Sequence, residues 1–465
     1  MIDAGLLDPL VHGTRALELT DDTAFLAAMV RAELSLSRAF VDAGAAPKWM
    51  LAVCDELAAG ALDAIELVAT SQASRAGGNP VIPLVRQLRA SADLVRAGAS
   101  DHVHVGATSQ DILDTAAMLV ARDVCDEVLT RIRTLGDSLA SLAETHRRTP
   151  MIGRTLGQHA SPTTFGFVAA GWLDGVTAAI LGLERTRAAL PLQLGGAVGD
   201  LSVLASVADA RGSGVEAISS ALSERLGLRL PPISWHGNRA PVLDLASSLA
   251  AAAMAVGVVA LDVTVLARTE IAEVAEGAGG GSSAMPHKHN PVAAVLVTAA
   301  ARRAPHTLSV LYSSALSEDQ RSSGAWHAEW LPLRELERLA VAAASGASDL
   351  VSNLRVDSSR MEQNMSITEG LVFSERISAA LAETMGRTAA FELVERASVE
   401  AERSSRPLQA VVAELAAHSG YDPGLRDAVW AAFGRADGQG GVAAIDRSIA
   451  AFRAVSPADS GGEQS

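Results

Sequence analysis

Apolar residues recur every three or four positions along most of this 465-residue chain, and strict alternation of apolar and polar residues is nearly absent. A period near 3.6 is typical of helices with one buried face, whereas a period of two is typical of half-buried strands. The pattern therefore predicts an all-α protein. Helices are expected at 23–46, 55–73, 81–96, 111–143, 162–190, 201–226, 241–276 and 292–317.

The lengths of these segments predict three helical domains. Residues 1–107 form an N-terminal helical domain, and 108–352 form a central bundle of about five long helices. Residues 353–465 form a smaller helical domain, which ends in a disordered tail, SPADSGGEQS. Long helices rich in alanine often bury a face only against other copies, so a homo-oligomer is expected.

The segment 245–261, LASSLAAAAMAVGVVAL, carries no charge and approaches the length of a membrane-spanning helix. Alanine dominates it, two serines interrupt it, and Asp262 follows at once. A thin, modestly apolar helix of this kind is typical of the core of a bundle. We therefore expect a buried helix and no membrane partner.

Composition narrows the class of protein further. The net charge is −15 without a basic block, which argues against a nucleic-acid partner. Cys54 and Cys125 lie far apart and in no metal-ligand spacing, so neither a disulfide framework nor a zinc cluster is indicated. The N-terminal residues MIDAGLLDPL show no secretory signal, and a cytoplasmic protein is expected.

The segment 277–291, GAGGGSSAMPHKHNP, is the first candidate for chemistry. Its four glycines allow close backbone approach to a ligand, and its serines and Lys288 supply hydroxyls and a cation. It has neither the spacing of a P-loop nor that of a GxSxG elbow. His287 and His289 lack a nearby carboxylate or cysteine, so no metal is expected.

Two further segments concentrate polar groups. In HVGATSQDILD, at 104–114, Thr108 and Ser109 are placed at a helix start and can present hydroxyls and N–H groups to an anion. A plain helix cap is the alternative interpretation. In RTLGQHASPTT, Gln158 and His159 precede Ser-Pro at another expected helix start, and a purely structural histidine is the alternative.

These three segments resemble a known family. Residues 281–291, GSSAMPHKHNP, resemble the GSSxMPxKxNP signature of the fumarase/aspartase superfamily, and the other two segments resemble its other shared regions in the same order. The resemblance covers most of the chain. It implies a homotetramer with a twenty-helix core, in which each active site draws on three subunits.

Within that superfamily the chain most resembles the bacterial 3-carboxy-cis,cis-muconate cycloisomerases. Four stretches carry this resemblance: GGNPVIPLV at 77–85, LQLGGAVG at 192–199, Trp235-His236, and RSSGAWHAEW at 321–330. Many lyases of the superfamily pair a histidine with a glutamate, and the corresponding positions here are Leu156 and Val295. Loss of both partners together implies lactonisation of 3-carboxy-cis,cis-muconate to 4-carboxymuconolactone.

The resemblance also implies roles for individual residues. Ser282 transfers the proton, Lys288 stabilises its alkoxide and the developing negative charge, and His159 orients the substrate or shares in proton transfer. The anchors for a small polycarboxylate substrate are Thr108, Ser109, Gln158, Ser283, Asn290 and Arg321. No cofactor and no metal are implied.

Two alternatives stay open. A lyase of the same superfamily, of the nitrosuccinate or adenylosuccinate type, would eliminate a group from a substituted succinate to give fumarate. A non-catalytic structural protein is the second, because the superfamily includes lens crystallins. The joint presence of Ser282, Lys288 and Asn290 argues against it.

Overall fold

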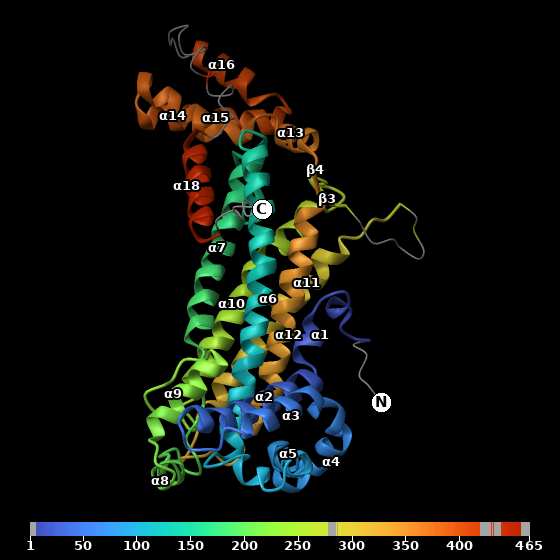
Figure 1. The fold of residues 1–465 in the computed structure, drawn as a ribbon. Coiled ribbons are helices and arrows are strands. Elements are labelled where there is room, and N and C mark those ends of the chain that lie inside the picture. Colours follow the sequence, from blue (N-terminus) through green and yellow to red (C-terminus); the bar gives the residue numbers. More distant parts are fainter. Residues whose placement is uncertain are drawn as a thin grey trace, which may run out of the picture. The chain divides into compact units, whose positions relative to one another are not determined.

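The computed structural model describes residues 6–277, 285, 287–418, 429, 431 and 439–456, and they form an all-α protein, as the sequence predicts (Figure 1). Within these residues, two two-stranded sheets interrupt the helices. The elements are α1 (Ala16–Thr20), α2 (Asp22–Asp42), α3 (Met50–Ala64), α4 (Leu67–Gly77), α5 (Val81–Val95), α6 (Ser109–Thr145), β1 (Pro150–Thr155), β2 (Gln158–Thr164), α7 (Phe165–Ala189), α8 (Ser202–Ala210), α9 (Val215–Leu226), α10 (Ala240–Leu266), β3 (Val274–Glu276), α11 (Val292–Ser314), α12 (Ala325–Ser352), β4 (Leu354–Val356), α13 (Ser358–Ser366), α14 (Ser374–Met385), α15 (Arg387–Ser404), α16 (Leu408–His418) and α18 (Gln439–Val455).

The chain divides into two compact units built from interleaved segments. Unit 1 comprises Met1–Ile132, Ala179–Gly257 and Leu296–Gly346, and unit 2 comprises Arg133–Ala178, Val258–Val295 and Ala347–Ser465. Each boundary falls inside one of the long helices α6, α7, α10, α11 and α12, so all five contribute to both units. The division into three domains at residues 107 and 352 stays a prediction, and its tail, from residue 457, lies outside the described residues.

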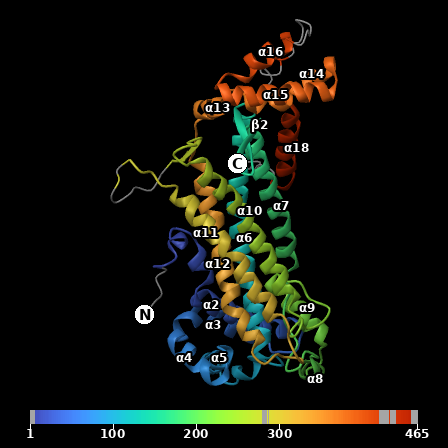
Figure 2. The ribbon, with the colours of Figure 1, turned by 180° about the vertical axis from the view of Figure 1, so that it is seen from behind.

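The parts of the five long helices that belong to unit 1 lie side by side (Figures 1 and 2). Between α7 and α10, the hydroxyls of Thr186 and Ser248 are 2.7 Å apart. Between α10 and α11, a Cβ added at Gly257 would lie 2.3 Å from the Cβ of Ala301. Small residues therefore let these helices approach closely, as the alanine-rich sequence predicts.

Two helices in the described part of the chain, α7 and α10, are long and apolar enough to cross a membrane by length and composition alone. In each, 56% of the most apolar window is buried inside the structure. The core helix of a bundle has this property, and α10 contains the segment 245–261 for which the sequence predicts that role.

Several predicted helices are shorter or divided. The segment 55–73 contains parts of α3 and α4, with a break near Ile65, and 201–226 is divided into α8 and α9, with Gly212 at φ +75° between them. The segment 241–276 is helical only to Leu266, because a turn with Ala272 at φ +53° leads into β3. The predictions of continuous helices were wrong there, because local breaks leave the apolar period unchanged.

The β1–β2 hairpin is the main element that sequence reasoning missed. Its strands pair antiparallel, with Arg154 opposite His159, and its tip carries Leu156 at φ +52° and Gly157 at φ +79°. Ser161 therefore lies in β2, and the helix start expected at Ser161-Pro162 is wrong, since α7 begins at Phe165. Strands this short, with glycine, proline and a register shift after Ile152, give no clear period of two.

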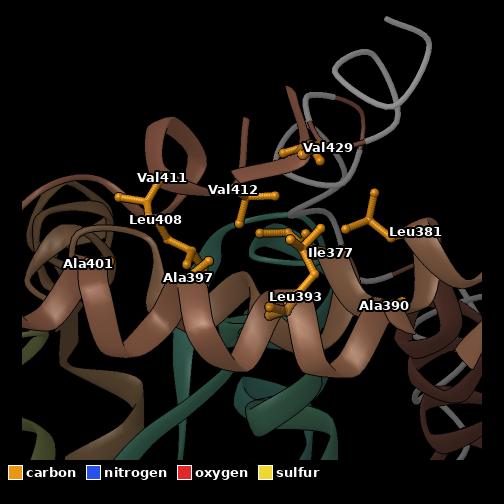
Figure 3. Close-up of a cluster of buried hydrophobic side chains, with 12 residues drawn as sticks. Ile377, Leu381, Ala390, Leu393, Ala397, Ala401, Leu408, Val411, Val412 and Val429 are labelled. Atoms are coloured by element: carbon orange, nitrogen blue, oxygen red, sulfur yellow. The ribbon is translucent and has the colours of Figure 1, made fainter. Parts of the chain in front are cut away.

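Unit 2 contains a separate hydrophobic cluster formed by helices that follow residue 353 (Figure 3). Ile377 and Leu381 of α14 pack with Leu393 of α15 and Val412 of α16, all at most 1% exposed. Burial of four such side chains contributes roughly 6–12 kcal/mol before the loss of conformational entropy is counted. The C-terminal helices thus have a core of their own.

Glu337 of α12 is fully buried, and its carboxyl oxygens have no hydrogen-bond partner among the described residues. Burial raises the pKa of Glu337 from 4.5 to about 8, against the attraction of Arg334 and Arg338. Between pH 4.5 and 8 the folded state therefore binds a proton that the unfolded state has released, so this group makes stability fall as pH rises.

We expect Glu337→Gln to remove this dependence. The variant should match the parent near pH 5 and exceed it at pH 8 by a few kcal/mol, on the order that such a pKa shift represents. Urea unfolding at both pH values measures the difference. Glu335→Gln is the control, because Glu335 lies on the same helix but is exposed and paired with Arg303. Identical pH dependence in the Glu337 variant and the parent would contradict the assignment.

Candidate active site

The N-terminus of α6 presents the first group of candidate residues. α6 begins at Ser109, so Thr108 and Ser109 lie at a helix start, as expected. The N–H of Thr108 donates to Asp111 Oδ2 at 2.9 Å, and the N–H of Asp111 donates to the Thr108 carbonyl at 3.0 Å. The sequence TSQD thus closes the first turn through Asp111. The hydroxyl of Thr108 is left for another partner.

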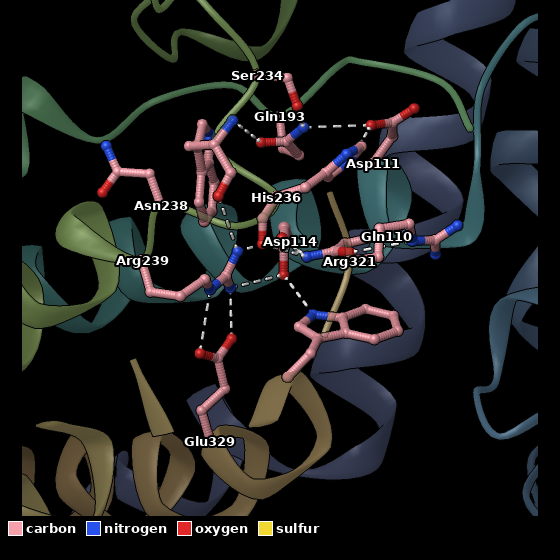
Figure 4. A network of polar contacts seen from close by, with 12 residues as sticks. Gln110, Asp111, Asp114, Gln193, Ser234, His236, Asn238, Arg239, Arg321 and Glu329 are labelled. Atoms are coloured by element: carbon pink, nitrogen blue, oxygen red, sulfur yellow. Dashed lines mark hydrogen bonds and ion pairs between the residues drawn. The ribbon is translucent and has the colours of Figure 1, made fainter. Parts of the chain in front are cut away.

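That partner is Arg321, from the loop between α11 and α12. Its side chain lies beside Gln110 (Figure 4). Its Nη1 donates to Thr108 Oγ1 at 2.9 Å, and its Nε donates to Gln110 Oε1 at 3.3 Å. The guanidinium lies 6.0 Å from the Trp326 ring centre. These bonds use two of the five N–H donors of an arginine, so the partly exposed guanidinium retains donors for a carboxylate.

A buried ionic network lies behind this anchor. Arg239 bonds to both oxygens of Asp114, at 2.8 and 3.1 Å, and to both oxygens of Glu329. Asp114 also accepts from Trp326 Nε1 at 2.9 Å and from Gln110 Nε2 at 3.2 Å. Burial raises the pKa of Glu329 to about 7, against the pull of Arg239 and with a further contribution from Asp114. Burial therefore outweighs the attraction of the shared guanidinium in setting the direction of this pKa shift.

Asp111 connects the helix start to two other segments (Figure 4). Its carboxylate accepts from the N–H groups of Thr108 and Gly196, each at 2.9 Å, and from Gln193 Nε2 at 3.3 Å. His236 Nε2 lies 2.7 Å from Asp111 Oδ1. Asp111 is 1% exposed, so it fixes these segments from within the fold.

The β1–β2 hairpin of unit 2 carries Gln158 and His159. Arg154 bonds to both oxygens of the buried Glu273, at 3.0 and 2.7 Å, and Asn364 donates to the same carboxylate at 2.8 Å. Partial burial, and then the charge of Arg154, lower the pKa of His159. Its Nδ1 is shielded from solvent and has no partner among the described residues. A neutral imidazole able to accept a proton is the form favoured at neutral pH.

The glycine-rich segment is described only in part. Ser282 and Ser283, the residues expected to transfer the proton and bind substrate, lie outside the described residues. Lys288 is exposed, and Asn290 immediately precedes the proline that leads into α11. Asn290 and Arg355 are among the residues that line a cavity of about 510 Å³ in unit 2.

Glu276, at the end of β3, caps the helix that follows this segment. Its carboxylate accepts from the N–H groups of Ala293 and Ala294, at 3.3 and 2.8 Å. Arg355 donates to the carbonyls of Glu276 and Gly277. Both flanks of the glycine-rich segment are therefore fixed by charged side chains of unit 2.

Among the described residues, the structure joins two of the expected site residues, Thr108 and Arg321, by a hydrogen bond. The other described ones are divided between the two units. Unit 1 holds Thr108, Ser109 and Arg321, and unit 2 holds Gln158, His159, Lys288 and Asn290. Across the described part of the chain, no group of three or more His, Cys, Asp or Glu residues is placed to hold a metal ion. The assignment of all these residues to one active site stays a prediction.

Sequence reasoning missed the buried residues that support the anchor. They are Gln110, Asp111, Asp114, Gln193, His236, Arg239 and Glu329. The spacing from Thr108 to Asp111 is a capping-box signal that sequence alone could have revealed. Their long-range contacts join residues up to 212 positions apart, and no local pattern marks them.

Comparison with known proteins agrees with the fold. The family model described as lyase matches residues 15–305. A nitrosuccinate lyase of Streptomyces davaonensis is 44% identical over 405 residues, covering 86% of this chain and 85% of the relative. A 3-carboxy-cis,cis-muconate cycloisomerase of Acinetobacter baylyi is 38% identical over 402 residues, covering 86% and 88%.

A solved structure extends the similarity to nearly the whole chain. The 3-carboxy-cis,cis-muconate lactonizing enzyme of Pseudomonas putida matches with a TM-score of 0.86 and 32% identity, covering 97% of this chain and 99% of that one. These matches define the protein as an enzyme of a lyase superfamily. The chain belongs to the fumarase/aspartase superfamily, which confirms the resemblance found in its sequence.

Proposed function

We propose that the protein is a cycloisomerase that converts 3-carboxy-cis,cis-muconate to 4-carboxymuconolactone. The observation that carries this proposal is the similarity in fold to a lactonizing enzyme over 97% of the chain. The curated cycloisomerase at 38% identity supports it, as do Leu156 and Val295, which stand where many lyases carry a histidine and a glutamate.

In the proposed reaction, one substrate carboxylate adds across a carbon–carbon double bond, and the carbanion formed next to another carboxylate is then protonated. Arg321 and Thr108, which contact each other, hold a substrate carboxylate. The guanidinium donates charge-assisted hydrogen bonds to it, and the hydroxyl donates a neutral one. Lys288 stabilises the aci-carboxylate as charge builds on it. Ser282 delivers the proton.

The remaining proposed site residues orient the substrate. His159 has a lowered pKa and so is neutral at pH 7, which suits it to accept a proton or a hydrogen bond. Ser109, Gln158, Ser283 and Asn290 supply uncharged donors to the other carboxylates. A homotetramer whose active sites combine segments of different subunits is part of this proposal, as is its cytoplasmic location.

Elimination from a substituted succinate is the second candidate function. The relative with this kind of chemistry, the nitrosuccinate lyase, is more similar in sequence, at 44% identity, than the cycloisomerase at 38%. Both reactions have a charged intermediate next to a carboxylate, so the same anchor and the same cation serve either one. Direct turnover separates them.

We expect the purified protein to consume 3-carboxy-cis,cis-muconate, followed as loss of the ultraviolet absorbance of its diene, with the lactone identified by NMR. In parallel, nitrosuccinate is offered, and nitrite and fumarate are measured. A kcat/KM for the muconate at least about tenfold above that for nitrosuccinate supports the proposal. Fumarate and nitrite as the faster products would replace it with the second candidate.

A further inference from the structure

His236 is a buried histidine that the proposed mechanism does not use. It is 4% exposed, and its Nε2 lies 2.7 Å from Asp111 Oδ1 (Figure 4). Asp111 already accepts hydrogen bonds from the backbone N–H groups of Thr108 and Gly196. Because the Asp111 carboxylate is the acceptor toward these donors, Nε2 of His236 carries the proton and donates in the contact between the two side chains.

The other ring nitrogen of His236 has no hydrogen-bond partner among the described residues and is shielded from solvent. Gly199 lies beside it at φ +88°, and a Cβ at that position would come 3.8 Å from Nδ1 and 3.3 Å from Ser234 Oγ. Buried polar atoms are rarely left unpaired, because they lose water without gaining a bond. Because Nδ1 of His236 makes no hydrogen bond with the described residues, the contact between Nε2 and Asp111 sets the orientation of the ring.

His236 is linked to the Arg321 anchor by two routes. Through its side chain it holds Asp111, which binds the N–H of Thr108. Through its carbonyl it accepts from Gln110 Nε2 at 3.1 Å, while Gln110 Oε1 accepts from Arg321 Nε. Because Arg321 also donates to Thr108 Oγ1, both routes end at the same guanidinium.

We infer that His236 is a positioning residue for the carboxylate anchor made by Thr108 and Arg321. Its Nε2–H keeps the Asp111 carboxylate turned toward the start of α6, and its carbonyl keeps Gln110 turned toward Arg321. The inference rests on the proposed function for the identity of the substrate that the anchor binds.

A matched pair of variants tests this role. His236→Phe keeps the ring volume and removes the donor to Asp111, whereas His236→Gln keeps an N–H at the position of Nε2. Loss of a hydrogen bond to a charged group should raise KM about 10- to 100-fold in the Phe variant, with kcat changed less than about threefold. The Gln variant should restore KM to within about threefold of the parent. Ser234→Ala is the control, because it removes only the bond to Gln193 and should leave KM unchanged.

A double-mutant cycle with Arg321→Met separates positioning from a general loss of stability. If His236 acts through the anchor, adding His236→Phe to Arg321→Met should raise KM no further. Additive losses, or a parental KM in the Phe variant, would overturn the inference. If the Phe variant does not fold, His236→Asn replaces it, since its amide is too short to reach Asp111 and should give the raised KM that Gln does not.

Calorimetric binding of tricarballylate, a saturated tricarboxylate, gives the same comparison without turnover. The parent and His236→Gln should bind it with similar affinity, and His236→Phe at least about tenfold more weakly. This measurement keeps the two proposals apart. If the parent converts neither substrate but the affinities follow this order, the proposed function fails and the role of His236 stands. Equal affinities in all three proteins would reject that role, whatever the enzyme turns over.

Discussion

Replacing Ser282 by alanine is expected to lower kcat by about 10³-fold while leaving the fold and the assembly unchanged. A positioned acid or base contributes about 10² to 10⁴ to a rate, and the serine hydroxyl is the proposed proton donor. Lys288 cannot replace it in this proposal, because its role is to stabilise charge. Steady-state turnover of 3-carboxy-cis,cis-muconate measures the loss, and circular dichroism with light scattering measures fold and assembly.

Ser283→Ala provides the matched control one position further along the chain. As a proposed substrate contact, it should raise KM several-fold and change kcat little, because it is assigned no proton. A Ser282 variant that keeps more than about a tenth of the parental kcat would show that another group transfers the proton. His159 would then be the first residue to test, since its pKa is lowered and its Nδ1 is unpaired among the described residues.

Mixing two catalytically impaired variants extends the same experiment to the assembly. Ser282→Ala and Arg321→Met alter different segments of the chain. If each active site combines segments of different subunits, mixed oligomers contain some sites in which both changes fall elsewhere, and activity should partly return. No recovery after verified subunit exchange would argue against shared active sites in a homotetramer.

The largest expected effect on stability follows from Arg239→Met. Arg239 is 3% exposed and is the partner of two buried carboxylates, Asp114 and Glu329. Removing one member of a buried ion pair typically costs about 3–5 kcal/mol, because the remaining charge stays desolvated. Urea unfolding at pH 7.5 should show a loss of this size.

The triple variant Arg239→Met, Asp114→Asn, Glu329→Gln is the control for this prediction. It removes the unpaired charges along with the guanidinium and should recover most of the lost stability. A single variant as stable as the parent would mean that the two carboxylates accept a shared proton without cost. Equal stability of the single and triple variants would likewise contradict the assignment of the loss to unpaired charge.

The sequence allowed the fold class to be predicted because a period near 3.6 persists through the long helices. It did not reveal where those helices break, since a turn such as the one after Leu266 interrupts the backbone and leaves the apolar period almost intact. The β1–β2 hairpin was missed for the opposite reason. Its strands are too short and too irregular to establish a period of their own.

The candidate site was predictable only where local sequence determines local structure. Thr108 and Ser109 were placed correctly at a helix start because capping depends on neighbours within one turn. The contact between Thr108 and Arg321 joins residues 213 positions apart, so only the resemblance to a family suggested that both bind substrate. The supporting role of His236 depends on a buried aspartate 125 positions away, which no local pattern shows.

The interleaving of the two compact units bears on how the protein can be cut or redesigned. The chain passes from one unit to the other five times, each time within a helix. Truncation at any of these points would leave a helix end whose last backbone groups lack hydrogen-bond partners. It would also remove segments of the chain that belong to the remaining unit. Neither unit is formed by one continuous segment of the chain. Insertions and new termini are therefore best placed in loops such as the one between α8 and α9.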